Sequence, residues 1–184
     1  MNVFYLSSDP IQAARFQCDR HLHTSFRDTL ILLSSVIRAS REVENLFKKQ
    51  IPYLQRADLL SPCEKSNPWL LWAKESPGHF NWLAIHGDAL ASEIAFRGFL
   101  RDGKKRASFD LSLLTSNFVA FARFAMDSNP NQLKSLPPLV MPSEFRKLNP
   151  SLATKQGVVN LYQIYYTAKM FQAFHAGNNF VWTN

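Results

Sequence analysis

Apolar residues recur every three or four positions along most of this chain, which is the spacing of one face of an α-helix. Asp9-Pro10 is a typical helix start, because Asp can accept hydrogen bonds from the first free N–H groups and Pro is tolerated in the first turn. Two apolar stripes follow, on either side of the polar stretch 23–25: Ile11, Ala14, Cys18 and Leu22, then Phe26, Leu30, Leu33 and Ile37. The pattern predicts two helices, or one kinked helix, from Pro10 to about Ile37.

Further segments with helical spacing or helix-start signals follow along the chain. They are residues 41–50, 68–76, 77–101, 111–126 and 157–175. Asn67-Pro68 and Ser76-Pro77 each place a capping residue before a proline, and Pro52 lies just beyond the first of these segments. We therefore expect a helix in each of them.

Two stretches lack this periodicity. Residues 3–7 form a short apolar segment, which we expect to be a strand or an extended arm packed on the core, and the Pro- and Asn-rich residues 127–150 are expected to wrap around the surface. A chain of 184 residues with 46% hydrophobic content is large enough to bury a core without covalent staples. The sequence thus predicts an all-α fold, with residues 1–184 forming a single compact multi-helix domain that has a short N-terminal extended arm.

The composition predicts the environment in which the protein works. No window approaches the roughly 20 apolar residues of a membrane span, and the N-terminus lacks the basic and apolar regions of a signal peptide. The two cysteines, Cys18 and Cys63, are too few for a disulfide framework, which fits a reducing compartment. We expect a soluble, cytoplasmic protein with free thiols and no membrane partner.

The charge is strongly positive. Lys and Arg number 21 against 14 Asp and Glu, a formal net charge of +7. Such an excess attracts polyanions, of which nucleic acid is the commonest, although many basic proteins are merely soluble. We expect DNA rather than RNA as the partner if the basic side chains converge, and the residues expected to track phosphates are Arg15, Arg20, Lys74, Arg97, Lys104, Lys105, Arg106, Arg146 and Lys147. For Arg97, a surface ion pair with Glu93 at i, i+4 is the preferred alternative.

The densest group of reactive side chains comprises Cys18, Asp19, His21 and His23. On a helix, Cys18 would neighbour His21 at i, i+3, and Asp19 would neighbour His23 at i, i+4. A carboxylate can orient an imidazole for general base catalysis, and a thiol beside a histidine can become a thiolate. We treat Cys18, Asp19 and His21 as candidate catalytic residues. The alternative is that Cys18 packs in the core while the others cap a helix or form ion pairs.

A second candidate lies at the junction of the two helices predicted at 68–76 and 77–101. Glu75 is four residues before His79 there, and a cleft often opens at a junction between helices. Glu75 is therefore a candidate general acid or base. Its neighbour Lys74 is a candidate phosphate clamp or amine nucleophile. Cys18 and His21 supply only two ligands, so we predict no metal site. No Gly-rich phosphate loop is present, which argues against a P-loop kinase or a Rossmann dinucleotide enzyme, and we predict no cofactor. The GxSxG motif of serine nucleophiles is also missing.

Several segments, in order along the chain, resemble a group of small phage and large-DNA-virus proteins that is itself distantly similar to pyrimidine-dimer DNA glycosylases of the endonuclease V type. The matching segments are Asp9-Pro10, Cys18-Asp19-Arg20-His21, 72–76, 81–83, 136–145 and 162–169. The glycosylase resemblance implies an all-helical fold that kinks or flips damaged DNA, a small N-terminal residue whose amine attacks the sugar C1′, and a helix glutamate that assists. This sequence departs from that pattern at both positions: Asn2 is larger than the residues that permit removal of the initiator Met, so the amine would belong to Met1, and His21 stands at the glutamate position.

These observations favour a viral nucleic-acid-acting protein, namely a DNA base-excision or base-modifying enzyme with the 18–23 region and Glu75 in one cleft. If the protein is viral, its compartment is the cytoplasm of the infected host cell. Two alternatives use the same charge: a non-catalytic protein that binds DNA or blocks a host factor, and an enzyme acting on free nucleotides. The oligomeric state is left open.

Overall fold

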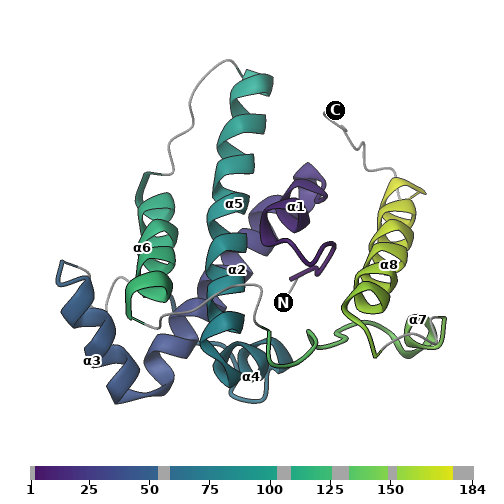
Figure 1. Cartoon of the computed structure of the whole chain (residues 1–184). Coiled ribbons are helices and arrows are strands. Elements are labelled where there is room, and N and C mark those ends of the chain that lie inside the picture. Colours follow the sequence, from purple (N-terminus) through teal and green to yellow (C-terminus); the bar gives the residue numbers. More distant parts are fainter. Residues whose placement is uncertain (1–2, 54–58, 103–108, 126–132, 149–152, 176–184) are drawn as a thin grey trace.

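The structure, a computed structural model, describes the backbone of residues 3–53, 59–102, 109–125, 133–148 and 153–175. Within these residues the chain forms eight helices and no strand, which confirms the all-α prediction (Figure 1). The helices are α1 (Pro10–Arg15), α2 (Asp19–Ala39), α3 (Arg41–Gln50), α4 (Pro68–Glu75), α5 (Pro77–Asp102), α6 (Phe109–Ala125), α7 (Ser143–Arg146) and α8 (Lys155–His175). The segments predicted for α3, α4, α5, α6 and α8 agree with these bounds to within two residues at each end.

Capping side chains set the starts of two helices as the sequence predicts. Asp9 Oδ1 accepts hydrogen bonds from the N–H groups of Ile11 and Gln12 at 2.8 and 2.9 Å, and α1 begins at Pro10. Asn67 Oδ1 accepts from the N–H of Trp69 at 2.9 Å at the start of α4. In both cases a polar oxygen pairs with N–H groups that have no partner within the helix.

The junction between α1 and α2 falls at residues 16–18, whereas the predicted break at 23–25 lies inside α2. The Arg97 guanidinium on α5 donates to the carbonyl oxygens of Arg15 and Gln17, at 2.9 and 2.6 Å. These carbonyls at the end of α1 are therefore paired with a cation from another helix. The expected position of the kink was wrong because this long-range contact leaves no mark on the local hydrophobic pattern.

The core is built around α5. Figure 1 shows α5 at the centre, with α6 and then α3 on one side of it and α8 on the other. The largest fully buried side chains include Trp69, Trp82, Phe80, Phe118 and Phe121. They join α4, α5 and α6 into one packed domain.

Gly87 on α5 permits the close approach of two neighbouring helices. A Cβ atom at this position would lie 3.2 Å from Cγ2 of Thr29 on α2 and 3.6 Å from Cγ2 of Thr115 on α6. The first distance is tighter than ordinary van der Waals contact. The missing side chain thus sets how closely α2 packs against α5.

The N-terminal segment is a buried extended arm, as expected. Its residues Val3, Phe4, Tyr5 and Leu6 are at most 3% exposed, and Figure 1 shows the arm between α1 and α8. The Gln163 side chain of α8 donates to the Leu6 carbonyl oxygen at 2.9 Å. The arm therefore links α8 to the rest of the core.

Residues 133–142 run in irregular conformation from α4 and α5 toward α8, where the Val140 N–H donates to the Tyr162 hydroxyl at 3.3 Å. His79 Nε2 accepts from the N–H groups of Lys134 and Ser135, at 3.0 and 3.2 Å, and so fixes one end of this segment. The short helix α7 follows, within the stretch that was expected to have no helix. In the part of the chain that the structure describes, no helix is both long and apolar enough to cross a lipid bilayer.

Candidate functional site

The start of α2 brings together side chains from three parts of the chain. Cys18 is the N-cap residue of α2, and its Sγ lies 3.6 Å from Nδ1 of His21, so the predicted i, i+3 contact is confirmed. The Tyr166 hydroxyl on α8 accepts a hydrogen bond from the Cys18 N–H at 2.7 Å. The rings of Phe4 and Tyr166 lie 5.4 and 5.3 Å from the His21 ring. We call this group, together with Lys169, the Cys18–His21 corner.

Burial keeps His21 and Tyr166 of the corner uncharged at neutral pH. Burial is the main cause that lowers the pKa of His21 to about 4, and the positive charges of Lys169 and Arg20 lower it further. The imidazole is therefore uncharged at pH 7 and retains one nitrogen able to accept a proton. Burial also raises the pKa of Tyr166, so its hydroxyl stays protonated.

Lys169 is the basic group at the rim of the corner. Its Nζ lies 5.2 Å from the centroid of the Phe4 ring, and its side chain is partly buried. Burial lowers the pKa of this amine, because the ammonium loses hydration. A lysine in such surroundings carries more of the uncharged amine at neutral pH than a lysine in water.

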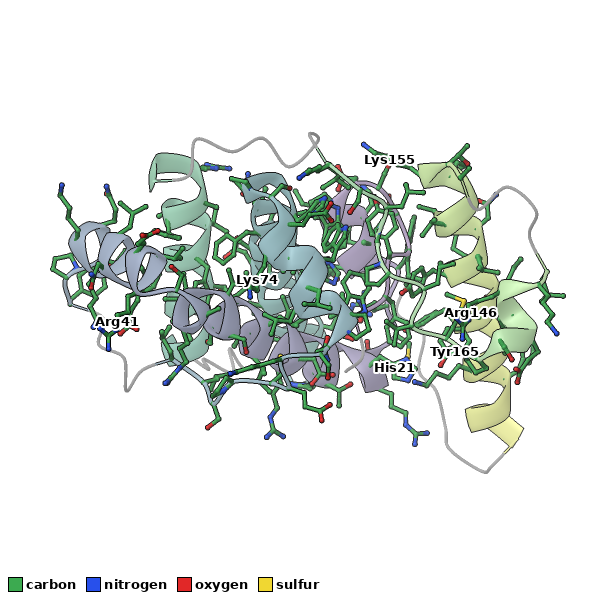
Figure 2. The ribbon with its side chains drawn as sticks, turned by 90° about the horizontal axis from the view of Figure 1, so that it is seen from below. His21, Arg41, Lys74, Arg146, Lys155 and Tyr165 are labelled. Atoms are coloured by element: carbon green, nitrogen blue, oxygen red, sulfur yellow. The ribbon has the colours of Figure 1, made fainter. Side chains whose placement is uncertain are left out.

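Aromatic rings connect the corner to α7 and to exposed cations. Tyr165 packs against Phe4 at 6.5 Å and against Phe145 of α7 at 5.1 Å, and the neighbouring Arg146 is exposed. Figure 2 shows His21, Tyr165 and Arg146 in one region of the molecule, with Arg41 at the opposite end. The exposed cations of this region are Arg20, Arg146 and Lys147.

Asp19 is paired with Arg97 rather than with His23. The Arg97 guanidinium lies 3.0 Å from Oδ1 of Asp19 and 3.0 Å from Oε2 of Glu93, and its side chain is 13% exposed. The predicted i, i+4 ion pair of Glu93 with Arg97 is therefore present. Its expected surface position is corrected, because α5 packs against the α1–α2 junction and leaves these two side chains only 18% and 13% exposed. Arg15 remains exposed and lies 3.6 Å from Glu93.

Glu75 lies in a separate group of residues. It accepts a hydrogen bond from the Ser135 hydroxyl and lies 3.9 Å from Nδ1 of the fully buried His79. That nitrogen donates to the Trp72 carbonyl oxygen at 2.7 Å, and burial lowers the pKa of His79. None of the contacts described for Glu75 joins it to the Cys18–His21 corner, and Figure 2 shows the exposed Lys74 apart from His21.

The predicted phosphate-binding residues Lys104, Lys105 and Arg106 lie outside the described residues. Among the residues that the structure does describe, no group of three or more His, Cys, Asp or Glu side chains is arranged to hold a metal ion. A groove of about 640 Å³ lies along α8 and is lined by Asn160, Gln163, Ile164, Thr167, Ala168 and Phe171. With about 100° of rotation per residue, these positions lie on the opposite side of α8 from Lys169, so the groove is not part of the corner.

Sequence reasoning missed the two α8 members of the corner. Tyr166 and Lys169 entered the sequence analysis only as part of the segment 162–169 that carries the resemblance. Cys18 and Tyr166 are 148 positions apart, and no local pattern pairs them. The nearest signal was the chemical type of Lys169, an amine beside two tyrosines on a predicted helix.

Comparison of the chain with models of protein families, with curated proteins and with solved structures finds no match. The function is therefore inferred from the residues themselves.

Proposed function

We propose that this protein binds DNA around the Cys18–His21 corner and acts there on a base or on its sugar, as a base-excision or base-modifying enzyme. The observation that supports this proposal is the group of exposed cations, Arg20, Arg146 and Lys147, near a buried corner in which an uncharged His21 contacts Cys18. Cations at the rim suit phosphates, and a desolvated interior suits chemistry on a nucleotide taken out of the base stack. The resemblance to phage proteins and DNA glycosylases favours the same class of substrate.

In this proposal the exposed arginines bind the DNA backbone and the buried corner carries out the chemistry. Guanidinium groups such as those of Arg20 and Arg146 bind phosphate oxygens with two parallel hydrogen bonds and position the backbone. The partly exposed ring of Tyr165 is the candidate for stacking a base, because base–aromatic stacking tolerates any base. Within the corner, His21 is uncharged at pH 7 and can accept a proton.

The salt dependence of DNA binding tests the location of the site. We would compare Arg20→Ala/Arg146→Ala with the charge-matched control Arg41→Ala/Lys49→Ala, whose residues are exposed on α3 at the other end of the molecule (Figure 2). Each phosphate contact contributes about 0.9 to the slope of log Kd against log salt for duplex DNA, so the first variant should lose about 2 from the slope. The control should keep the original slope. An equal loss of slope in both variants would show that DNA binding depends on the net charge alone and not on a site near His21.

Ligand and product analysis separates the enzyme from its alternatives. Duplex DNA, single-stranded DNA, RNA and free nucleotides are titrated in parallel, and release or alteration of bases in a panel of modified duplexes is followed by mass spectrometry. We expect binding to DNA with turnover of at least one modified base. Binding without any turnover would favour a DNA-coating or host-factor-blocking protein. Tight binding of a nucleotide without affinity for DNA would favour a nucleotide-processing enzyme.

A further inference from the structure

We propose that the Cys18–His21 corner binds a terminal phosphate group, whose oxygens are held by Arg20, His21 and Lys169. Such a group is a phosphate monoester, and both a free nucleotide and the 5′ end of a DNA strand carry one. The inference goes beyond the proposed function, which concerns the bases and the internal phosphates of DNA. It would stand even if the protein had no affinity for the interior of a DNA strand.

His21 supplies a polar atom that has no partner in the fold. The residue is only 8% exposed. Its Nδ1 lies 3.6 Å from Sγ of Cys18, whereas in the described part of the chain no hydrogen bond reaches Nε2. The Cys18 thiol can donate to Nδ1, and Nε2 then carries the ring proton. A largely buried N–H of this kind gains from an acceptor oxygen on a ligand.

Two cations from different helices face this imidazole. Arg20 precedes His21 on α2 and is exposed, and the partly buried Lys169 approaches from α8. Both lie close enough for their charges to contribute to the low pKa of His21. The Nζ of Lys169 lies 5.2 Å from the centroid of the Phe4 ring, whose face favours the ammonium and so opposes the effect of burial. Positive charge from two sides disfavours a protonated ring and favours a bound anion.

The start of α2 adds to the positive potential of the corner. Cys18 is the N-cap residue of this 21-residue helix but provides no side-chain capping bond, and the N-terminal end of a helix dipole is positive. The carboxylate in the first turn, Asp19, is paired with Arg97 at 3.0 Å. Tyr166 adds no negative charge, because burial keeps its hydroxyl protonated, and Arg97 faces it from α5. An anion is thus the ligand that these charges match.

The charge and shape of a terminal phosphate fit the corner better than those of an internal one. A phosphate monoester carries a charge of about −1.5 to −2 at pH 7, which two cations can balance. An internal phosphodiester continues into the chain on both sides. The imidazole of His21 is packed against Phe4 and Tyr166, with ring centroids 5.4 and 5.3 Å away, so a group attached on one side only can reach it more easily.

Nuclear magnetic resonance of the histidine rings tests the site without any substitution. A nucleoside 5′-monophosphate is added to the protein, and the pKa of each histidine is measured with and without it. A phosphate beside His21 should raise the pKa of this residue by about 1 or more, because a nearby negative charge favours the imidazolium. The exposed His23 on the same helix is the internal control and should not change. The same change with the nucleoside, which lacks the phosphate, would overturn the inference.

Substitutions test which cations hold the phosphate. Arg20→Gln and Lys169→Gln are compared with Arg41→Gln and Lys49→Gln, which remove exposed charges on α3 at the other end of the molecule (Figure 2). Each of the first two should weaken binding of the nucleotide by about tenfold or more, as expected for loss of a hydrogen bond between charged groups. Thermal unfolding checks that each variant is folded. Equal losses in the α3 variants would show that only net charge matters and would overturn the inference.

Oligonucleotides with and without a 5′-phosphate distinguish the two sources of the group. Tighter binding of the phosphorylated oligonucleotide would assign the site to a strand end, and a gain for the free nucleotide alone would assign it to a nucleotide. No gain from a terminal phosphate in either ligand would overturn the inference. If hydroxyl-ended duplex DNA still bound, the proposed function would stand. If the phosphate gain were present without affinity for that duplex, the inference would stand and the proposed function would fall.

Discussion

His86 makes the stability of the fold sensitive to acid. Its ring is fully buried on α5, where Nδ1 donates to the Pro10 carbonyl oxygen at 3.0 Å and Nε2 accepts from the side-chain amide of Gln17 at 3.3 Å. The ring also stacks on Trp82, with the centroids 4.9 Å apart. Burial lowers the pKa of His86 to about 4, because a protonated ring would lose its hydration and its acceptor nitrogen.

The sign and size of the effect follow from this pKa. The pKa of about 4 in the folded protein lies below the ordinary histidine pKa of 6.5, so between these pH values the unfolded chain binds a proton that the folded chain does not. The stabilisation is complete above pH 6.5 and is lost as the pH falls toward 4. At 1.36 kcal/mol per pKa unit, the difference between 6.5 and about 4 corresponds to about 3 kcal/mol. His21, with its pKa also lowered to about 4, contributes a loss of the same order.

Urea unfolding at a series of pH values measures this loss. Fluorescence of the buried Trp69 and Trp82 reports unfolding, and each histidine should add about 1.4 kcal/mol per pH unit to the slope of the unfolding free energy between pH 6 and 4.5. His86→Asn keeps a side-chain N–H donor but cannot take up a proton. The His86→Asn variant should be less stable at pH 7, because the stacking of the ring on Trp82 is lost. Its unfolding free energy should depend less steeply on pH, with a slope lower by about 1.4 kcal/mol per pH unit.

The exposed His23 on α2 supplies the matched control. His23→Asn should leave both the stability at pH 7 and the slope close to those of the original protein. A flat profile in the original protein between pH 6 and 4.5 would refute the reasoning. An unchanged slope in His86→Asn would refute the assignment to this residue.

Two further predictions concern α5. Arg97→Gln should lower the free energy of unfolding by about 2–4 kcal/mol, because Asp19 and Glu93 would lose the cation between them. If urea unfolding gives the variant the same free energy of unfolding as the original protein, this ion-pair network contributes little to stability. Gly98→Ala should raise the free energy of unfolding by about 0.5–1 kcal/mol in thermal unfolding, because a Cβ there meets nothing within 4 Å and alanine favours the helix. Gly87→Val should instead destabilise the protein, since even a Cβ would lie 3.2 Å from Thr29, and equal effects of the two glycine variants would contradict the packing argument.

Local signals predicted most of the fold. Asp9 and Asn67 mark helix starts because a capping bond forms between residues two or three positions apart. The sequence could not place the α1–α2 junction, because Arg97 supplies hydrogen bonds to it from about 80 positions away. The sequence also did not reveal α7, because a helix of four residues is too short to show a periodic hydrophobic pattern.

The same distinction applies to the candidate site. The contact of Cys18 with His21 follows from i, i+3 spacing, and it was predicted. The hydroxyl of Tyr166 and the amine of Lys169 reach the corner only because the buried arm holds α8 beside the start of α2. A tertiary contact of this kind depends on how whole helices pack, so a pattern of neighbouring residues cannot reveal it.

The structure divides the predicted cations into two kinds with different consequences for function. Arg97 lies between two carboxylates and two carbonyl oxygens, so its charge is used in holding α5 against the α1–α2 junction. Arg20 and Arg146 are exposed near a corner in which burial keeps the His21 imidazole uncharged. Cations of the second kind can contact a phosphate at the surface of the folded protein. The hypothesis of a DNA site therefore depends on the exposed cations around His21, and the net charge of the whole chain is the weaker argument.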